Sequence, residues 1–431
     1  MAAVYASASN QVAALKELYT GDDYMKDLVY KKNPLMALLP KDESPSGFAG
    51  KYIPVPLIFG TPQGRSATFS NAQNNQTAPQ LASFFVYRVS NYQLATITNE
   101  LLEATKDNAG AFIDEAKLVM DTAFRNISND LAADIYRSGT GSRGNFVVAP
   151  VLNGVSNAVT ITLANRSDVN QMEVGMVLVA SATDGSAPST DTVTVTSVNR
   201  STGVVGGTAS VTPASGLSAN WQAAAGYLAI QGDIPVSGST STGTALKISG
   251  LAAWGPQVAP SPGALFWGVD RSSDSRMIFT IASGTASETI EEALIDAACQ
   301  VAEIGGQPDM CFMNFTSYAA LEKSLGSKVQ YVAIKHEEAD ISFAGIQIHA
   351  PYGPVSVIPD RNCPPKTAYM LQMDTLKLRS LGKAPHILTY GMEGLEGLRV
   401  GNADALEIRI GYYGNLICNA PCWNCVVSLS N

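Results

Sequence analysis

Charged residues are scarce in this sequence, and they do not gather into long patches of one sign. Lys, Arg, Asp and Glu make up 15% of the 431 residues, and the formal net charge is −9. A surface that neutralises nucleic-acid phosphates needs clustered Lys and Arg, so the composition argues against a protein built to hold nucleic acid tightly. Because little charge is available to cover the surface, we expect other copies of the chain to cover part of it, although a compact secreted β protein would have a similar composition.

Histidine is scarcer still, and the common catalytic motifs are missing. None of the three histidines, His336, His349 and His386, lies three or four residues from another, so no helical metal-binding pair is expected. The sequence contains no G-x-S-x-G motif, no Walker loop and no Rossmann glycine pattern after a strand. His336-Glu337-Glu338 could belong to a hydrolytic metal site, but a solvated loop or strand end is the favoured interpretation. We therefore predict no catalytic residues, no cofactor and no enzyme activity.

Six cysteines, a low count for this length, do not indicate a disulfide framework or a metal centre. Cys418, Cys422 and Cys425 form the one sequence cluster, and a tetrahedral zinc site would need a fourth ligand that has no obvious source. Free structural thiols are expected. The longest uncharged stretches, Gly144–Asn165 and Ser201–Gly232, are rich in Asn, Ser, Thr and Gly, so no membrane span is predicted. The N-terminal residues lack the basic and apolar segments of a signal peptide, so secretion is not expected.

Residues 1–48 are predicted to form an N-terminal arm. Two short amphipathic pieces, Val12–Leu18 and Tyr24–Val29, are separated by a turn, and a proline follows them. Helices this short are marginal in isolation, so the arm is expected to lie on a neighbouring surface.

Residues 49–100 are predicted to form a projecting β-hairpin. Lys51–Phe59 and Phe84–Thr98 have the composition of strands, and a polar, Gly-, Asn- and Gln-rich segment joins them. Pro54 and Pro56 cannot donate to a ladder and indicate an edge strand. Because a lone hairpin is not stable in water, this one needs a partner surface.

The strongest helical pattern runs from Asp107 to Ser138, within a predicted region of residues 101–150. Its apolar residues recur every three or four positions, and Gly139 is placed to end the helix. Such a long helix would serve as a strut.

Composition then changes abruptly. Only eight of the 126 residues from Gly144 to Val269 are charged, and Thr, Ser, Val and Gly dominate. Short alternating runs bounded by Gly, Asn and Asp predict strands. We therefore predict an inserted small all-β domain, a sandwich or barrel, over residues 151–247, with Gly238–Gly243 as its exit linker.

A second helix is predicted over Glu288–Ile304. Thr289 and Glu292 fit a capping box, and Gly305-Gly306 ends the pattern. Further along, Tyr352–Leu378 is predicted to form a stiff strand–turn–strand hairpin around Pro359, Pro364 and Pro365.

The order of these elements resembles the major capsid protein of tailed bacteriophages, whose shell-forming fold is shared with encapsulins and with the floor of herpesvirus capsids. The resemblance rests on six stretches: NPLMALLPK from Asn33, GKYIPVPLIFG from Gly50, the helix Asp107–Ser138, GLAAWGPQVAPSPGALFWGVDRS from Gly250, IEEALIDAACQVAEIGGQPDMCFMN from Ile290, and ADALEIRIGYYGNLICNAPCWN from Ala403.

The resemblance implies an α+β fold with named parts. These are an N-terminal arm (1–48), an extended hairpin loop (49–100), a peripheral domain with a spine helix (101–150), the insertion (151–247), an axial domain (248–400) and strands that return to the peripheral domain (401–431). The Tyr352–Leu378 hairpin would then lie in the axial domain, near a symmetry axis.

The resemblance also implies a function and partners. The chain would self-assemble as hexamers and pentamers into an icosahedral shell around double-stranded DNA, held without sequence specificity, and the shell would assemble in the host cytoplasm. No charged helical segment precedes the arm, so a separate scaffolding protein is expected, together with a portal and a possible decoration protein. Expected inter-subunit contacts are Lys51, Arg65, Phe69, Arg88, Asp360 and Arg361. Some relatives join subunits through a Lys–Asn isopeptide bond, which the placement of Lys51 and Arg65 does not favour here.

Three alternatives stay open at this point. An encapsulin-like compartment would have the same fold and hold a cargo enzyme instead of DNA. A β-rich adhesin or tail component would explain the Thr/Ser/Val-rich middle, although the two helices argue against it. A hydrolase using His336 and Glu337 is the third.

Overall fold

The computed structural model of the chain divides into two compact units, which are described separately. One unit comprises residues 1–32, 90–131 and 381–413, and the other comprises residues 33–89, 132–380 and 414–431. The structure describes residues 33–44, 50–98, 115–153, 157–212, 216–223, 225–236, 238, 245–284, 288–325, 331–336, 339–388, 398–399 and 404–429. Most of the predicted arm, the first part of the predicted long helix and Glu337 lie outside these residues. None of the described helices is long and apolar enough to cross a membrane.

The first unit is built on a long strand beside a long helix. Strand β23 (Ala405–Cys418) pairs with β4 (Val89–Thr98), β21 (His386–Ile387) and β22 (Leu398–Arg399). The helix α5 (Glu115–Asp134) lies within the predicted Asp107–Ser138, and its apolar residues Ala123, Ile127 and Leu131 are buried as the periodicity predicted. Asn91 of β4 donates to a carboxylate oxygen of Asp130 at 2.7 Å, which joins strand to helix.

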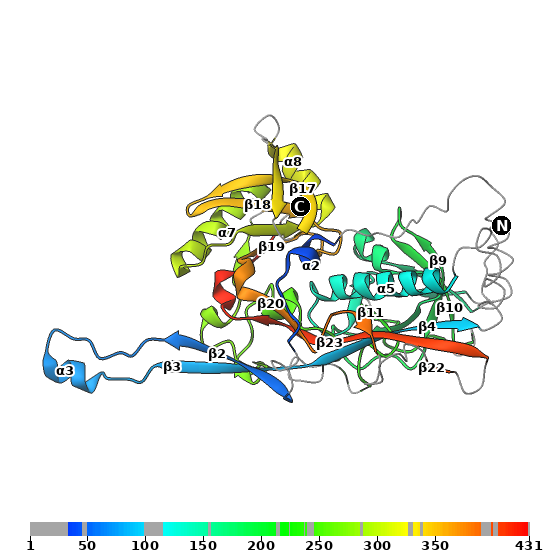
Figure 1. Ribbon diagram of the computed structural model, residues 1–431, viewed down its shortest axis with the longest axis horizontal. Coiled ribbons are helices and arrows are strands. Elements are labelled where there is room, and N and C mark those ends of the chain that lie inside the picture. The colour runs from blue at the N-terminus through cyan, green and yellow to red at the C-terminus, as the bar shows by residue number, and fades with distance from the viewer. Residues whose placement is uncertain are drawn as a thin grey trace. The chain divides into compact units, whose positions relative to one another are not determined.

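The second unit contains a seven-stranded mixed sheet covered by two helices (Figure 1). The helix α7 (Ile290–Ile304) has the predicted capping box between Thr289 and Glu292, and Gly305 ends it with a left-handed φ of 94°. The helix α8 (Phe315–Leu325) follows the buried strand β15. In order across the sheet, the strands are β14 (Thr280–Ser283), β24 (Cys425–Ser428), β19 (Thr367–Leu371), β15 (Met310–Met313), β18 (Gly353–Pro359), β17 (Ala339–Ala350) and β16 (Tyr331–His336).

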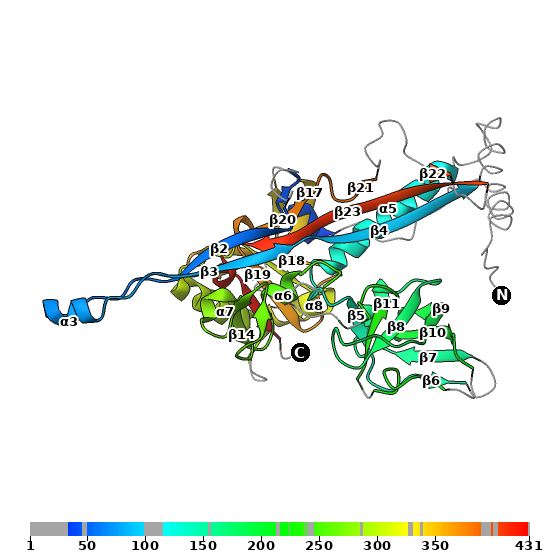
Figure 2. The ribbon, with the colours of Figure 1, turned by 90° about the horizontal axis from the view of Figure 1, so that it is seen from below.

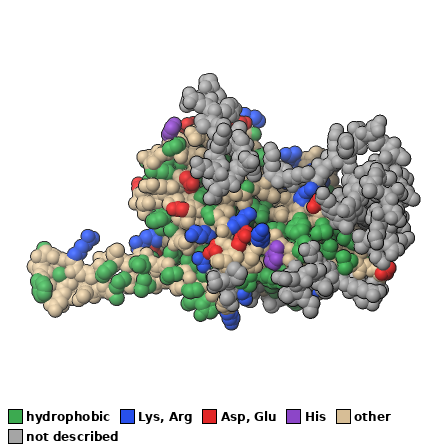
Figure 3. Space-filling view, viewed as in Figure 1, with side chains coloured by type: hydrophobic (Ala, Val, Ile, Leu, Met, Phe, Trp, Pro, Cys, Tyr) green, Lys and Arg blue, Asp and Glu red, His purple; other side chains and the backbone are tan. Residues whose placement is uncertain are grey.

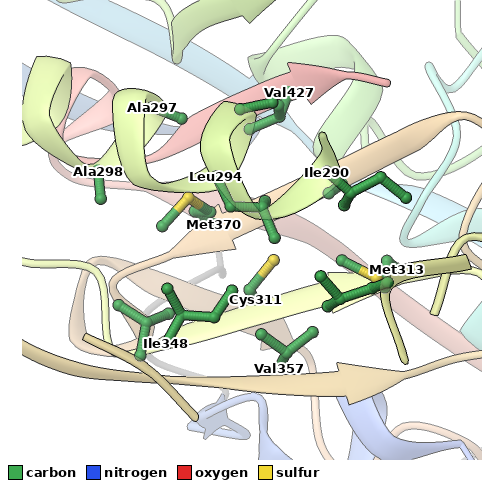
Figure 4. Close-up of a cluster of buried hydrophobic side chains, with 14 of the residues drawn as sticks. Ile290, Leu294, Ala297, Ala298, Cys311, Met313, Ile348, Val357, Met370 and Val427 are labelled. Atoms are coloured by element: carbon green, nitrogen blue, oxygen red, sulfur yellow. The ribbon is translucent and has the colours of Figure 1, made fainter. Parts of the chain in front are cut away.

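The core of this unit lies between α7 and the sheet. Ile290, Leu294 and Ala297 point from the helix toward Met370, Val427 and other strand side chains (Figure 4). These three residues recur at intervals of four and three positions, so the helical period of 3.6 residues places them on one face, which is the buried one.

The predicted hairpin Tyr352–Leu378 is wrong in its pairing. Strands β18 and β19 are not neighbours, because β15 lies between them, parallel to β18 and antiparallel to β19. A strand from much earlier in the chain thus occupies the place that a hairpin partner would take. The last part of the segment belongs to β20 (Leu376–Ser380), which pairs with β23 and, in parallel, with β1 (Lys41–Asp42).

A separate antiparallel sheet contains the strands of the predicted insertion and one strand before it (Figure 2). An antiparallel bridge between Phe146 and Leu163 links the residues that directly follow β5 (Ser142–Asn145) and β7 (Ala158–Thr162). Because these two strands are far apart in the order of the sheet, the bridge curls the sheet toward a barrel. Trp221 stacks on Phe146 with ring centroids 6.2 Å apart inside its own apolar core. In order across the sheet, the strands are β5 (Ser142–Asn145), β11 (Tyr227–Ile230), β8 (Val177–Ser181), β9 (Val193–Asn199), β10 (Val204–Ala209), β7 (Ala158–Thr162) and β6 (Val151–Leu152). We call this sheet with its core the inserted barrel.

The inserted barrel begins before the predicted boundary at residue 151. Strand β5 reads Ser-Arg-Gly-Asn, which lacks the apolar alternation of a typical strand, so the sequence pattern could not reveal it. Its pairing with β11, at the far end of the insertion in sequence, brings it into the sheet.

Candidate assembly surface

A two-stranded hairpin of the second unit offers apolar surface to a partner. Strand β2 (Tyr52–Gly60) pairs in antiparallel register with β3 (Gln80–Tyr87), and a short helix, α3 (Phe69–Asn74), lies in the segment that joins them (Figure 1). The predicted second strand, Phe84–Thr98, was too long. Tyr52, the first residue of β2, is already paired with Tyr87, so no partner remains in β2 and the chain continues as β4 on β23.

One face of the hairpin base is fixed to the rest of its unit. Ile53, Val55, Phe84 and Val86 alternate along the two strands and are almost fully buried. The Phe84 ring packs edge-on against Trp254 at 5.2 Å, beside Phe266 at 6.1 Å. This aromatic packing anchors the base.

A short two-stranded ribbon, β12 (Leu265–Phe266) and β13 (Val269–Asp270), completes the anchor. The backbone N–H of Phe85 donates to the carbonyl oxygen of Trp267 in the turn between them, at 3.0 Å. The guanidinium of Arg271 lies 4.0 Å from the centroid of the Phe266 ring, a cation–π arrangement, and burial lowers the pKa of Arg271 to about 10.

The opposite face and the tip expose large apolar side chains. Ile58 is 74% exposed, Leu81 is 67% exposed and Phe69 on α3 is 82% exposed. Hydrophobic side chains recur along this extended part of the surface (Figure 3). Thr61, Arg65, Phe69 and Gln73 are among the residues that line an open hollow of about 650 Å³ at the tip. A strand pair with apolar residues on both faces is suited to burial on both, and only one face is buried within the described chain.

The predicted contact residues of the hairpin are placed where a neighbouring molecule could reach them. Lys51, Arg65 and Phe69 are exposed, and Arg88 is half-buried between β3 and β4. Lys51 lies at the base and Arg65 at the tip, as the sequence indicated. Their contacts with another copy stay predictions.

The prediction that Asp360 lies at an inter-subunit surface is wrong. Asp360 is 1% exposed, and its carboxylate accepts hydrogen bonds from the Tyr136 hydroxyl at 2.9 Å and from the backbone N–H groups of Asn362 and Leu35. Burial raises the pKa of Asp360 above its ordinary value, and desolvation together with this carboxylate raises the pKa of Tyr136. Asp360 thus ties α2 (Pro34–Leu38), which lies within the predicted arm, to the loop after β18.

Arg361, next to it, is partly buried. Its guanidinium donates to the carbonyl oxygen of Asn170 in the inserted barrel's short helix η2 (Arg166–Gln171). This internal contact gives the side chain a structural role, and a contact with a neighbour stays a prediction.

The residues considered for chemistry do not converge in the described part of the chain. His349 is exposed and His386 is half-buried, while the side chain of His336 lies outside the described residues. Within those residues, no three His, Cys, Asp or Glu side chains are grouped as a metal site would require. All six thiols are free, and burial raises the pKa of Cys418 and of Cys425 to about 12.

The sequence-based prediction included the exposed Phe69 but missed the other exposed apolar residues of the hairpin and favoured its charges. Ile58 and Leu81 face each other across β2 and β3, and Tyr52 packs edge-on against Phe85 at 4.9 Å on the exposed side of the base. The available signal was the lack of polar alternation in KYIPVPLIF, since a half-exposed strand ordinarily alternates.

Comparison with known proteins shows what the chain is similar to. Residues 226–390 match the family model described as the SU10 major capsid protein. A search of curated proteins gives no match. The structure of the cyanophage A-1(L) capsid asymmetric unit is similar to this chain with a TM-score of 0.56 and 13% identity, over 95% of this chain and 96% of that one.

Two further solved structures are similar at lower scores. The holo-SrpI encapsulin complex from Synechococcus elongatus PCC 7942 has a TM-score of 0.46 at 8% identity, over 97% of this chain and 94% of that one. The capsid of a native GTA particle has a TM-score of 0.44 at 9% identity, over 95% and 94%. The inference on fold rests on the cyanophage capsid. The match over residues 226–390 and the fold shared with the cyanophage A-1(L) capsid agree with the resemblance drawn from the sequence: the chain has the fold of that capsid protein, and residues 226–390 are similar to the SU10 major capsid protein.

Proposed function

We propose that the chain assembles as hexamers and pentamers into a closed icosahedral shell, in which a neighbouring copy covers the exposed face of the β2–β3 hairpin. The observation that carries this proposal is the contrast between the two faces. Ile53 and Val55 are 6% and 5% exposed, whereas Ile58, Leu81 and Phe69 are 74%, 67% and 82% exposed. Each copy would both offer its hairpin and accept another, which is the head-to-tail arrangement that generates rings.

The finer parts of the function belong to the same proposal. The shell would enclose double-stranded DNA without sequence specificity, and the net charge of −9 supports a wall that does not hold phosphates tightly. Assembly would take place in the host cytoplasm with a separate scaffolding protein, a portal and a possible decoration protein. The shell would have no enzymatic role. We assign the arm, hairpin, peripheral, inserted and axial parts with the residue bounds predicted from the sequence, with the insertion starting at β5.

Substitution of Phe69 by Ser tests the proposal at the hairpin tip. Phe69 is 82% exposed, so the Phe69→Ser subunit should keep its melting temperature while the yield of closed shells falls several-fold, because the lost apolar area is area that a neighbour covers. Ser70→Ala on the same helix changes little apolar area and serves as the control. Unchanged shell yield with Phe69→Ser, measured by electron microscopy and sedimentation, would refute the role of the tip.

The content of the particles separates this function from an encapsulin-like one. Particles purified from the natural source should contain DNA protected from nuclease and show five- and six-fold units in reconstructions. A packaged enzyme in place of DNA would support the compartment alternative while leaving the shell itself intact.

A further inference from the structure

Four charged residues lie at the neck of the inserted barrel, where the chain enters and leaves it; three are buried and Asp233 is half-buried. Asp134 ends α5, Arg143 lies in β5, Asp233 follows β11, and Lys247 lies on the returning chain. Their side chains are 6%, 4%, 15% and 6% exposed, respectively. We call these four residues the neck quartet.

Each carboxylate in the neck quartet faces both cations. Arg143 lies 3.3 Å from Asp134 and 3.6 Å from Asp233, and Lys247 lies 3.6 Å from Asp134 and 3.2 Å from Asp233. The formal charges of the quartet cancel. Buried charges that lose one partner are strongly destabilising, so removing any one of the four should destabilise the group.

The backbone around the neck quartet leaves little room for movement. Gly139 and Gly141 have φ of 83° and 91°, and a Cβ on them would lie 3.1 Å from the carbonyl oxygen of Ile248 and 2.7 Å from that of Asp233. The outgoing and returning chains therefore touch through their backbones. The backbone N–H of Leu251 also donates to the carbonyl oxygen of Ile135 at 2.7 Å.

A group of hydrogen bonds also connects the outgoing chain to the inserted barrel itself. The carboxylate of Asp184 accepts hydrogen bonds from the hydroxyl groups of Ser138 at 3.1 Å, of Thr140 at 2.6 Å and of Ser142. A flexible linker would carry none of these contacts, since Gly/Ser linkers behave as random coils.

We propose that the neck quartet is an ionic clasp that fixes the inserted barrel to the end of α5 and to the returning chain, so that every copy in a shell presents the barrel in one orientation. The four charges come from separate stretches of chain, and they can satisfy one another in one arrangement of those stretches. The inserted barrel has its own core, so the clasp sets its position and is not needed for its folding.

Hydrogen–deuterium exchange of the full chain tests the clasp with Asp233→Asn, which leaves two cations facing one carboxylate. Exchange at the amides of Leu251 and Arg137 beside the neck should rise at least tenfold. Exchange at Val195 and Ala209 inside the inserted barrel should stay within twofold of the unmodified chain. Glu173→Gln is the matched control, because it breaks an ion pair of 2.8 Å with Arg200 whose side chains are about half exposed, and it should change neither set of amides.

A double variant keeps the test decisive if the single variant fails to fold. The double variant Asp233→Asn/Lys247→Met loses one acid and one base and keeps the balanced pair of Asp134 and Arg143. It should therefore fold, while hydrogen exchange at the amides of Leu251 and Arg137 stays raised. Unchanged neck exchange in a folded variant would overturn the proposal. An equal rise in the neck and in the barrel would also overturn it, because the quartet would then support barrel folding.

Discussion

The two faces of β2 allow one residue type to be tested in two environments. Ile53 is 6% exposed and packs into the anchored face, whereas Ile58, further along the same strand, is 74% exposed on the outward face. We consider Ile→Thr at each position, because Thr keeps the β-branched shape that suits a strand and replaces two apolar carbons by a hydroxyl.

The expected effects follow from these exposures. Covering each of the two lost carbons of Ile58 would contribute about 0.8 kcal/mol to the free energy of association. Only the 74% of the side chain that is exposed can still be covered, so the loss is about 1.2 kcal/mol for each contact with a neighbour. That energy corresponds to about a sevenfold rise in the critical concentration for assembly. The unassembled subunit should change by less than about 0.5 kcal/mol. At Ile53 the lost packing and the buried hydroxyl should destabilise the subunit itself by about 2–4 kcal/mol.

Urea unfolding of the subunit and light scattering during assembly measure the two quantities separately. Ile58→Thr should raise the critical concentration for assembly and leave the urea midpoint of unfolding unchanged. Ile53→Thr should lower the urea midpoint. If Ile58→Thr assembles at the same critical concentration as the unmodified chain, the outward face is not covered in the shell and the reasoning is refuted.

Three further predictions concern the interior of the second unit. Thr289→Ala removes the capping box of α7 and should lower subunit stability by about 1 kcal/mol in thermal unfolding, and an unchanged melting temperature would contradict the cap. Because burial raises the pKa of Asp360 above 3.8, the stability that its proton supplies is present below about pH 4 and is lost as pH rises through the folded pKa. The free energy of unfolding of the unmodified chain minus that of Asp360→Asn should therefore fall as pH rises, and a constant difference in urea midpoints would count against this. Iodoacetamide at about pH 8 should modify the half-buried Cys299 and Cys422 well before the buried thiols, and mass spectrometry showing the reverse order would disprove it; the buried thiols are Cys311, Cys363, Cys418 and Cys425.

Local signals in the sequence were enough to locate several elements. The capping box at Thr289 and the glycine after Ile304 gave the bounds of α7 closely, because both ends of that helix are specified by neighbours in sequence. The apolar stripe of α5 and the two prolines of β2 correctly indicated a buried helix face and a two-stranded hairpin.

Pairings between distant residues could not be predicted in the same way. Strand β15 separates β18 from β19 through contacts between parts of the chain that are far apart in sequence, and nothing local to Tyr352–Leu378 indicates this. Asp360 stands in a turn-like Pro-Asp-Arg-Asn stretch that suggests exposure, yet the hydroxyl of Tyr136, from a distant part of the sequence, makes its burial tolerable. That the hairpin contacts a neighbouring copy stays a prediction, and two of its exposed apolar residues, Ile58 and Leu81, were not among the predicted contacts.

Hydroxyl-radical footprinting of free subunits and of purified shells measures whether a neighbouring copy covers the hairpin, because it reports the exposure of individual Tyr, Phe, Leu and Ile side chains. Ile58, Phe69 and Leu81 should be labelled readily in the free subunit and lose most of that labelling in the shell, while Ile53 and Phe84 should stay unlabelled in both. Equal labelling of Ile58, Phe69 and Leu81 in subunits and shells would show that no neighbouring copy covers the hairpin, and would contradict the proposed assembly.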